Sequence, residues 1–446
     1  MPSSLTVVLV SLLLSLPVVI FWLWLVILPA RVAILCPEKC RCDIGGYHVK
    51  CDGTSINPVP LIHLPDVRWL LLFTSKILLL VNDSFATMAE LDRLEISNSG
   101  LRSIELRAFN GLTKLTELFL FDNEISEIKP GTFKSMISLE NLDLHSNRIE
   151  HVDRDTFSGL YKLKYINLCG NKLQYLHPDA VLMLPNLQKL LLVENPGLQI
   201  PTDSNFITSY TLSYLALGFC NISSVSVDTF QSMISLNYLN LAGNRIEHVD
   251  RDMFSGMFKL EYISLSINKL QYLHPDTFLM LPNLQTLDLG SNPGLKIPTD
   301  RNFFTSHSLS HLDISRCNVS SVSVDTFANF SALELLDLMH NNLRTIDINI
   351  LRALPKLSTL YLQDNPLQCD CQLKEVWRWC KDRNIRTVYG VLAPECDTPK
   401  KLKGMSWGVL EKGQCLQGDI QYYTDYKNYT DTQMSYSYKS SFNSDF

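Results

Sequence analysis

Several kinds of catalytic motif are missing from this sequence. It contains no G-x-S-x-G, no H-E-x-x-H and no glycine loop that could cradle a phosphate. The ten histidines are dispersed, and several recur at matching places in an internal repeat, as His151 and His248 do. We therefore expect no enzymatic activity, no metal site and no cofactor.

A basic surface is also missing. The chain has 39 Lys and Arg against 45 Asp and Glu, which gives a formal net charge of −6. No run of Lys or Arg suggests a polybasic patch for membrane or heparin. The sequence therefore excludes nucleic acid as an expected partner, because such partners need a clustered positive charge.

Long apolar runs are absent apart from one near the start. Residues Leu5–Ala30 carry no charge, and about 20 apolar residues suffice to span a bilayer. We favour a cleaved signal peptide within residues 1–33, with an uncleaved N-terminal anchor as the alternative. Both place the rest of the chain outside the cytosol. We expect a secreted protein, or a cell-surface protein that touches the membrane only if this segment stays uncleaved.

What the sequence has in abundance is internal repetition. Residues 135–231 and 232–328 are two copies of one 97-residue passage that differ at 30 positions. Each copy holds four segments of the form L-x-x-L-x-L-x-x-N/C-x-L, and 17 of their 20 inner x positions differ, against 13 of the other 77. Side chains alternate along a strand, so the x positions share one face. Drift at exposed sites would also have changed the polar stretch 148–155, which is retained. We therefore predict a binding face that diversified after duplication.

The repeat extends beyond the two copies. Thirteen repeats occur at a spacing of 24 residues with two steps of 25, and a phenylalanine recurs between them. This period is typical of a leucine-rich repeat solenoid. The expected fold is a right-handed α/β-type horseshoe with a parallel inner sheet and short irregular or 3-10 outer segments. The repeats begin at Val67, Leu91, Leu115, Leu139, Leu163, Leu187, Leu212, Leu236, Leu260, Leu284, Leu309, Leu333 and Leu357.

Two groups of cysteines flank the array. The end repeats of a solenoid need caps, and disulfide-stapled segments make such caps in oxidising compartments. We predict an N-terminal cap at 34–66, the array at 67–367, a C-terminal cap at 368–415 and a disordered tail at 416–446. Spacing alone leaves the pairing within each group open. The groups are Cys36, Cys40, Cys42 and Cys51, and Cys369, Cys371, Cys396 and Cys415.

The segments CPEKCRCDIGGYHVKC and NPLQCDCQLKEVWRW resemble the flanking caps of extracellular leucine-rich repeat proteins. Slit, the Toll ectodomain and chaoptin-like adhesion proteins belong to this group, which also has short secreted members. The resemblance covers residues 36–415. It implies disulfides Cys369–Cys396 and Cys371–Cys415, and a role in molecular recognition.

Four cysteines lie outside the caps. Cys220 and Cys317 occupy the ninth repeat position, where other repeats carry Asn, and we interpret both as small buried polar groups of the core. Cys169 and Cys380 are expected to be unpaired and exposed. An exposed thiol outside the cell suggests a disulfide-linked oligomer, although a tolerated free cysteine is the alternative.

The inner x positions supply the candidate binding residues. Tyrosines at the third position of consecutive repeats predict a continuous column, and tyrosine is favoured at interfaces. Aspartates at the fifth position are candidates too, although L-D-L is simply a common filling of this repeat. The candidate partner-binding residues are Tyr165, Lys189, Tyr214, Phe219, Tyr238, Tyr262, Asp288, His311 and Asp313.

Modification sites agree with an extracellular chain. Acidic tyrosine clusters in flexible secreted segments are candidates for sulfation, with an inert tail as the alternative. The tail tyrosines are Tyr422, Tyr423, Tyr426 and Tyr429. The N-x-S/T sequons for glycosylation are Asn82, Asn221, Asn318, Asn329 and Asn428.

Together these features predict a secreted or cell-surface recognition and adhesion protein. Its concave face should bind a protein or a glycoconjugate, or a second copy of the chain. The alternatives are a secreted inhibitor of an enzyme and an extracellular-matrix organising protein.

Overall fold

The computed structural model describes residues 36, 40–43, 45–53, 66–201, 204–416 and 419–421, with side chains up to 413. Two compact bodies make up the chain, Met1–Lys296 with Phe304–Leu309, and Ile297–Phe303 with Ser310–Phe446. Asn428, the signal-peptide prediction for 1–33 and the sulfation candidates of the tail lie outside the described residues.

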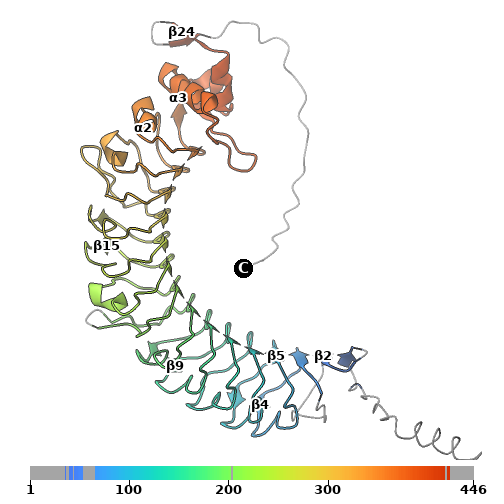
Figure 1. Ribbon diagram of the computed structural model, residues 1–446. Helices are drawn as coiled ribbons and strands as arrows, with labels where there is room; N and C mark the ends of the chain where they lie inside the picture. Colours follow the sequence, from blue (N-terminus) through green and yellow to red (C-terminus); the bar gives the residue numbers. More distant parts are fainter. Residues whose placement is uncertain are drawn as a thin grey trace, which may run out of the picture. The chain divides into compact units, whose positions relative to one another are not determined.

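The first body is a parallel sheet of stacked repeats (Figure 1). Strands β1 (Cys40–Cys42) and β2 (His48–Asp52) pair antiparallel and open the sheet, and β2 then pairs with β3 in parallel. Every following strand begins two residues after the first leucine of its repeat. These strands are β3 (Trp69–Phe73), β5 (Arg93–Ser97), β7 (Glu117–Phe119), β8 (Asn141–Asp143), β10 (Tyr165–Asn167), β12 (Lys189–Leu191), β13 (Tyr214–Ala216), β14 (Tyr238–Asn240), β16 (Tyr262–Ser264) and β18 (Thr286–Asp288).

Alternation along each strand separates core from surface. In β14, Leu239 is fully buried, whereas Tyr238 and Asn240 on either side of it are partly exposed. The fourth and sixth repeat positions therefore fill the core, and the third and fifth face outward on the inner side. This is the placement that the repeat pattern predicts.

The outer side contains more strand than the sequence predicts. Short irregular or 3-10 segments were expected there, and η1 (Val227–Phe230) is one of them, but two-residue parallel strands also pair on this side. The outer phenylalanines are fully buried; Phe109 and Phe133 stack at 6.1 Å and Phe254 and Phe278 at 5.9 Å between ring centroids. The outer pairs are β4 (Leu79–Leu80) with β6 (Ser103–Ile104), β9 (His151–Val152) with β11 (Tyr175–Leu176), and β15 (His248–Val249) with β17 (Tyr272–Leu273).

Buried asparagines join neighbouring repeats. Asn171 Oδ1 accepts the N–H of Ile149 in the preceding repeat at 3.0 Å, and its Nδ2 donates to the carbonyls of Leu144 and Leu168. Buried polar atoms need such partners. The same arrangement recurs along the array, so each repeat satisfies the backbone of the one before it.

Cys220 replaces this asparagine in β13's repeat. Its Sγ donates to the carbonyl of Leu192 at 3.1 Å, but a thiol lacks the amide oxygen that would accept the N–H of Leu198. That N–H instead bonds to the carbonyl of Asn195 at 3.0 Å, within the N-P-G-L turn of its own repeat. The buried, structural role expected for Cys220 and Cys317 matches their positions.

The second body contains three inner strands and the C-terminal cap. Strands β19 (His311–Asp313), β20 (Leu335–Asp337) and β21 (Thr359–Tyr361) are parallel and in register. The outer elements are η2 (Asp325–Phe327) and α2 (Ile348–Arg352). The cap comprises β22 (Leu367–Gln368), α3 (Cys371–Asp382), β23 (Cys396–Thr398), η3 (Lys400–Leu402), η4 (Trp407–Glu411), β24 (Gln414–Leu416) and β25 (Asp419–Gln421).

Disulfides are present in both caps. Cys36 pairs with Cys42 and Cys40 with Cys51 at the N-terminal end. In the C-terminal cap Cys369 pairs with Cys396, the pairing that the resemblance implies. Cys371 is also disulfide-bonded; the side chain of its expected partner, Cys415, is outside the described residues.

Cys380 corrects one expectation. It lies on α3, as predicted, but its side chain is buried with only 2% exposed. Burial also raises the pKa of its thiol to about 12. Since the face of α3 that carries Cys380 packs inward, this thiol cannot form the intermolecular bridge that an exposed cysteine would allow.

Candidate functional site

Three tyrosines form the predicted column on the inner face. Tyr214, Tyr238 and Tyr262 are in direct register on β13, β14 and β16. Their rings stack with centroids 3.9 and 4.3 Å apart and interplanar angles of 5°. Stacked rings cover one another's faces, so the column presents ring edges and hydroxyl groups to a partner. Ring edges carry the positive part of the aromatic quadrupole.

Protonation adds to this polarity. Burial raises the pKa of the Tyr214, Tyr238 and Tyr262 hydroxyls above the ordinary value of 10.0. All three hydroxyls are protonated at physiological pH, and they hydrogen-bond along the column, Tyr214 with Tyr238 and Tyr238 with Tyr262. The column as a whole suits carbonyl or carboxylate acceptors.

Lys189 and Tyr165 extend the column at its N-terminal end. Lys189 Nζ lies 4.8 Å from the centroid of the Tyr214 ring, so the cation covers the outer face of that ring. Tyr165 pairs in register with Lys189 and is half-buried. Burial raises the pKa of Tyr165 to about 12. The structure thus brings five of the predicted partner-binding residues into one row.

Phe219 projects beside this row and is 48% exposed. Its backbone has φ 56°, in the left-handed region that large residues rarely adopt. A Cβ added to Gly243 would lie 2.5 Å from the Phe219 ring, so the ring rests directly on the bare backbone of the next repeat. Only glycine at 243 permits this contact.

The eighth position of every repeat in the first body shares this backbone conformation. Most repeats place Gly or a small polar residue there, whereas Phe219 and Ile267 are apolar and exposed. Ile267 has φ 53°, a genuine outlier for a β-branched side chain. Strain of this kind concentrates at functional sites. The sequence alone did not single out Ile267, because the left-handed backbone is visible only in the structure.

A histidine and an aspartate form a second polar feature on the inner face. His145 Nδ1 lies 2.7 Å from Asp143 Oδ1, and the His145 ring stacks on Phe121 with centroids 4.8 Å apart. The hydrogen bond to Asp143 raises the pKa of His145 above its ordinary value. Asn240 and Ala242 replace the pair in the second copy, so this feature belongs to the first copy alone.

The aspartate candidates have local structural roles. Asp288 accepts the backbone N–H of Gly290 at 3.0 Å and the hydroxyl of Ser264 at 2.8 Å. In the second body, Asp313 accepts the N–H of Ser315 at 2.7 Å, and His311 Nδ1 lies 2.8 Å from the hydroxyl of Ser310. A fifth-position Asp or Asn therefore stabilises its own turn. This explains why the residue recurs in the repeat.

Cys169 is less accessible than the sequence suggests. It lies at the seventh position on the inner face, as expected, but is only partly exposed. Burial raises the pKa of its thiol to about 12, and the thiolate is the reactive form in disulfide chemistry. An intermolecular bridge through Cys169 is therefore disfavoured.

The predicted glycosylation sites lie at the surface to different degrees. Asn82, Asn221 and Asn318 are exposed, whereas Asn329 is only partly exposed. Asn221 and Asn318 adopt left-handed backbone with φ 62° and 58° immediately after the ladder cysteine. Both follow the inner strand of their repeat.

A polar groove borders the tyrosine column. Its volume is about 540 Å³, and its walls come from the second repeat position and from the residue before each repeat. It contains amides, hydroxyls and one charge of each sign. The lining residues are Gln188, Thr211, Ser213, Ser235, Asn237, Lys259, Glu261 and Asn283. Sequence analysis missed this groove, because the second position is the least conspicuous of the x positions.

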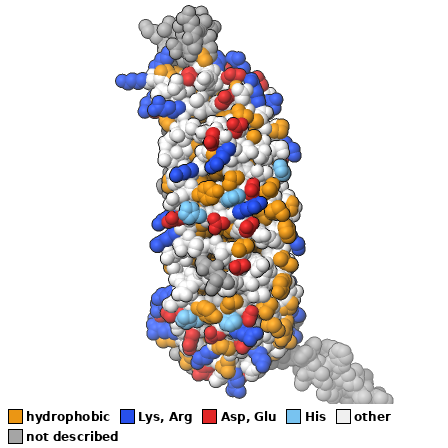
Figure 2. Space-filling view, turned by 90° about the vertical axis from the view of Figure 1, so that its left-hand side faces the viewer, with side chains coloured by type: hydrophobic (Ala, Val, Ile, Leu, Met, Phe, Trp, Pro, Cys, Tyr) orange, Lys and Arg blue, Asp and Glu red, His pale blue; other side chains and the backbone are white. Residues whose placement is uncertain are grey.

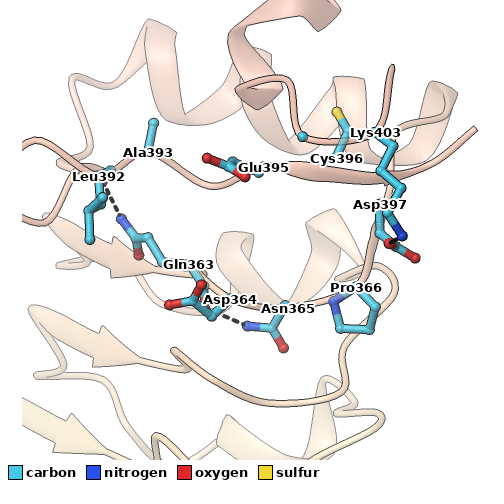
Figure 3. A pocket seen from close by; sticks show the side chains of 11 residues that line it. Gln363, Asp364, Asn365, Pro366, Leu392, Ala393, Glu395, Cys396, Asp397 and Lys403 are labelled. Atoms are coloured by element: carbon cyan, nitrogen blue, oxygen red, sulfur yellow. Dashed lines mark hydrogen bonds and ion pairs between the residues drawn. The ribbon is translucent and has the colours of Figure 1, made fainter. Parts of the chain in front are cut away.

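The second body has a pocket of about 270 Å³ where β21's repeat meets the cap (Figure 3). Gln363 donates from Nε2 to the carbonyls of Thr387 and Leu392 at 2.9 and 2.8 Å. On the opposite wall, Lys403 pairs with Asp397 at 2.7 Å. The glutamine ties the last repeat to the cap, which gives this pocket a structural explanation.

Among the described residues, no cluster of His, Cys, Asp or Glu could hold a metal ion. The described helices also include none with the length and apolar character needed to cross a membrane.

The chain matches a family model described as Leucine rich repeat. The matched residues are 89–149, 137–196, 211–270, 240–293 and 307–367, together more than half of the chain.

Curated relatives match shorter stretches. Human Matrix-remodeling-associated protein 5 is 33% identical over 103 residues, covering 21% of this chain and 4% of that protein. Trophoblast glycoprotein of Macaca fascicularis is 31% identical over 125 residues, covering 28% and 29%. The Phospholipase A2 inhibitor of Gloydius brevicaudus siniticus is 32% identical over 114 residues, covering 26% and 34%. The match thus spans at most about a third of any of these three relatives.

Solved structures share the architecture. The TLR13–ssRNA13 complex gives a TM-score of 0.66 at 26% identity, covering 75% of this chain and 49% of that chain. The mouse RP105/MD-1 complex gives 0.54 at 19% identity, covering 76% and 57%, which shows the fold alone. Thirteen inner strands of the described residues begin two residues after a repeat start, buried asparagines join the repeats, and disulfides are present at both ends. With this family match, the chain belongs to the leucine-rich repeat family.

Proposed function

We propose that this chain is an extracellular or cell-surface recognition protein that binds a protein partner through the inner face of its first body. The contact centres on Tyr214, Tyr238 and Tyr262, with Phe219 at its border. The observation that carries the proposal is the stacked column beside an exposed, strained phenylalanine. Large aromatics in the centre of an interface are the usual hot spots.

A protein fits this face better than a glycan does. Sugars pack on the faces of aromatic rings, but here each ring covers the face of the next and Lys189 covers the outer face of Tyr214. The column therefore exposes the edges of its tyrosine rings and their hydroxyl groups. A polypeptide offers carbonyl oxygens and apolar side chains in the mixture that this surface accepts.

Nucleic acid fits less well, although one similar structure is titled as a complex with ssRNA. Binding of a phosphate backbone rests on free Lys and Arg. On the inner face, Arg93 is paired with Glu117 at 2.9 Å and Lys189 lies over a tyrosine ring. These two cations are already engaged.

An extracellular location has independent support. Disulfides staple both caps, and disulfides persist in oxidising compartments. Inhibition of a secreted enzyme is a second candidate function, because one relative is named Phospholipase A2 inhibitor. Adhesion and matrix organisation require the same binding face and differ only in the partner.

The test compares full-length secreted protein with two matched variants in capture from extracellular fluid. The inner variant carries Tyr214→Ala, Phe219→Ala, Tyr238→Ala and Tyr262→Ala. The outer variant carries Glu150→Ala, Arg154→Ala, Glu247→Ala and Arg251→Ala.

Mass spectrometry quantifies the bound proteins. We expect at least one protein that is retained by the wild type and the outer variant but reduced roughly tenfold or more by the inner variant, since hot spots are worth about 2 kcal/mol or more. Loss of binding in the outer variant alone would place recognition on the other side. Activity assays on the captured protein then separate inhibition from adhesion.

A further inference from the structure

A row of exposed apolar side chains follows one edge of the first body. It occupies the position two residues before each repeat start, where the chain turns toward the inner strand. Five of its members are between 52% and 59% exposed, and the two prolines are also exposed. The edge row consists of Ile137, Tyr161, Pro185, Tyr210, Ile234, Phe258 and Pro282.

The row is continuous along seven consecutive repeats. Asn186 Nδ2 donates to the carbonyl of Tyr161 at 2.7 Å, and Asn283 Nδ2 donates to that of Phe258 at 2.8 Å, so in each copy one pair of neighbouring repeats is hydrogen-bonded at this edge. Consecutive strands lie about 4.8 Å apart, which makes the row about 30 Å long. Figure 2, which views the outer side of the repeats, shows hydrophobic side chains gathered along one edge.

The exposed apolar area is large for a surface without a partner. Each aromatic ring of the row leaves about half of its roughly 200 Å² in water. The exposed side chains of Leu182, Met183, Leu279 and Met280 flank the two prolines. The whole patch is about 600 Å², at the upper end of what soluble monomers expose. With a rim drawn from the polar groove it reaches the roughly 800 Å² per partner of a standard interface.

We propose that this edge is a self-association surface that pairs with the edge row of a second copy of the chain. The spacing of the row is set by the repeats, so a second edge row has ridges at the same interval and can interdigitate over its full length. Closed dimers use one patch twice through a two-fold axis. In an antiparallel pairing Tyr210, the central member, lies opposite its own counterpart, and Tyr161 lies opposite Phe258.

The few charges beside the row leave one lysine uncompensated in each half of the pair, so the affinity must come from the apolar contact. Lys162 of one copy faces Lys259 and Glu261 of the other. Among the described residues Glu261 forms no ion pair within its own chain, so its carboxylate can take up one of these positive charges. The sequons Asn82 and Asn221 are not members of this row. The edge is separate from the tyrosine column, and both surfaces can act in one molecule.

Sedimentation of the full-length secreted protein over a wide concentration range tests the proposal. We expect a reversible dimer whose dissociation constant rises roughly tenfold or more in the double variant Tyr161→Ser with Phe258→Ser. The matched control is Tyr175→Ser with Tyr272→Ser, which removes two equally repeated exposed tyrosines on β11 and β17. This control should dimerise like the wild type. Circular dichroism and thermal melts establish that both variants fold.

Crosslinking supplies the geometry. Tyr210→Cys should give a disulfide-linked dimer under mild oxidation, and Tyr175→Cys should give none. A protein that stays monomeric at all concentrations would overturn the proposal, as would a dimer that the edge variant leaves intact. The single inner-face substitution Tyr238→Ala should leave sedimentation unchanged. If Tyr238→Ala abolishes dimerisation instead, the chain self-associates through the inner face and the edge proposal is wrong.

Discussion

The inner face and the edge of the duplicated passage have changed to very different extents. At the inner x positions the two copies share almost nothing, and Asp143 and His145 of one copy are Asn240 and Ala242 of the other. At the edge, Ile137 and Ile234 are identical and so are Pro185 and Pro282, whereas Tyr161 becomes Phe258 and Tyr210 becomes His307. Both surfaces are exposed, so exposure does not explain the contrast. Three of the four edge positions keep an apolar side chain in both copies, as a surface that pairs with a copy of itself requires. A face that binds another protein is free to differ between the copies.

Truncation of a buried phenylalanine should cost more unfolding free energy than truncation of an inner-face tyrosine. Phe254→Ala removes a fully buried ring that stacks on Phe278, and such truncations cost about 3–5 kcal/mol. Tyr238→Ala removes a half-buried ring, whose two stacking contacts are worth about 0.5–1.5 kcal/mol each. Chemical denaturation should therefore rank Phe254→Ala as clearly the more damaging. An equal loss from both would mean that the tyrosine column is part of the core.

Gly243 links the binding face to the fold. Gly243→Ala places a Cβ 2.5 Å from the Phe219 ring on a backbone with φ 69°. We expect a loss of about 1–2 kcal/mol in stability, together with displacement of Phe219 and weaker partner capture. The matched control is Gly256→Ala, where φ is 84° but a Cβ would meet nothing within 4 Å. This control should lose stability and keep binding. Equal binding by both variants would show that Phe219 does not need its support.

Ile267 tests whether the inner face stores strain. Ile267→Asn places a residue that tolerates the left-handed backbone at φ 53° and removes an exposed apolar group. We expect the variant to be more stable by about 1 kcal/mol. Weaker capture of the partner at the same time would identify the isoleucine as a binding residue that the fold holds at a cost. Unchanged stability in thermal melts would contradict the strain argument.

The smallest expected effect is a pH dependence confined to the first copy. Hydrogen bonding to Asp143 raises the folded pKa of His145 above 6.5. A raised pKa contributes stability that is present below the unfolded pKa and is lost as the pH rises through the folded pKa. The free energy of unfolding of the first copy should therefore rise slightly on acidification. Titration of His145 by NMR should give a pKa that falls in Asp143→Asn; an unchanged value would exclude the carboxylate as its cause.

Much of this architecture is predictable from the sequence because the repeat is strict. Each inner strand begins two residues after its leucine, and the tyrosine column follows directly from a shared position. The outer strand pairs, such as β9 with β11, were missed because two residues give no periodic signal. Cys380 was misjudged because α3 turns it inward, which its spacing from Cys369 does not reveal.

The edge row and the support of Phe219 by Gly243 could not be predicted from the sequence, because they depend on contacts between residues of different repeats. The edge row lies at a position that is apolar in most repeats of the duplicated passage, but exposure there depends on how the turn enters the strand. Phe219 was predicted as a binding residue, whereas its support by Gly243 required the coordinates. The sequence pattern therefore predicts which repeat positions share a face, whereas the contacts between individual side chains come from the structure.

The thiol of Cys220 has a consequence for how such arrays can grow. A repeat may lengthen to 25 residues with an N-P-G-L turn because that turn satisfies its own N–H, as Leu198 does with Asn195. The next repeat then needs no asparagine side-chain oxygen to accept that N–H, so a cysteine can occupy its ninth position. Leu295 and Asn292 form the same local bond in the second copy, which again precedes a Cys, at 317. The 25-residue repeat and the cysteine that follows it therefore occur together in both copies. If recombination separated them, a 24-residue repeat could be followed by a cysteine, and its backbone N–H would then have no acceptor.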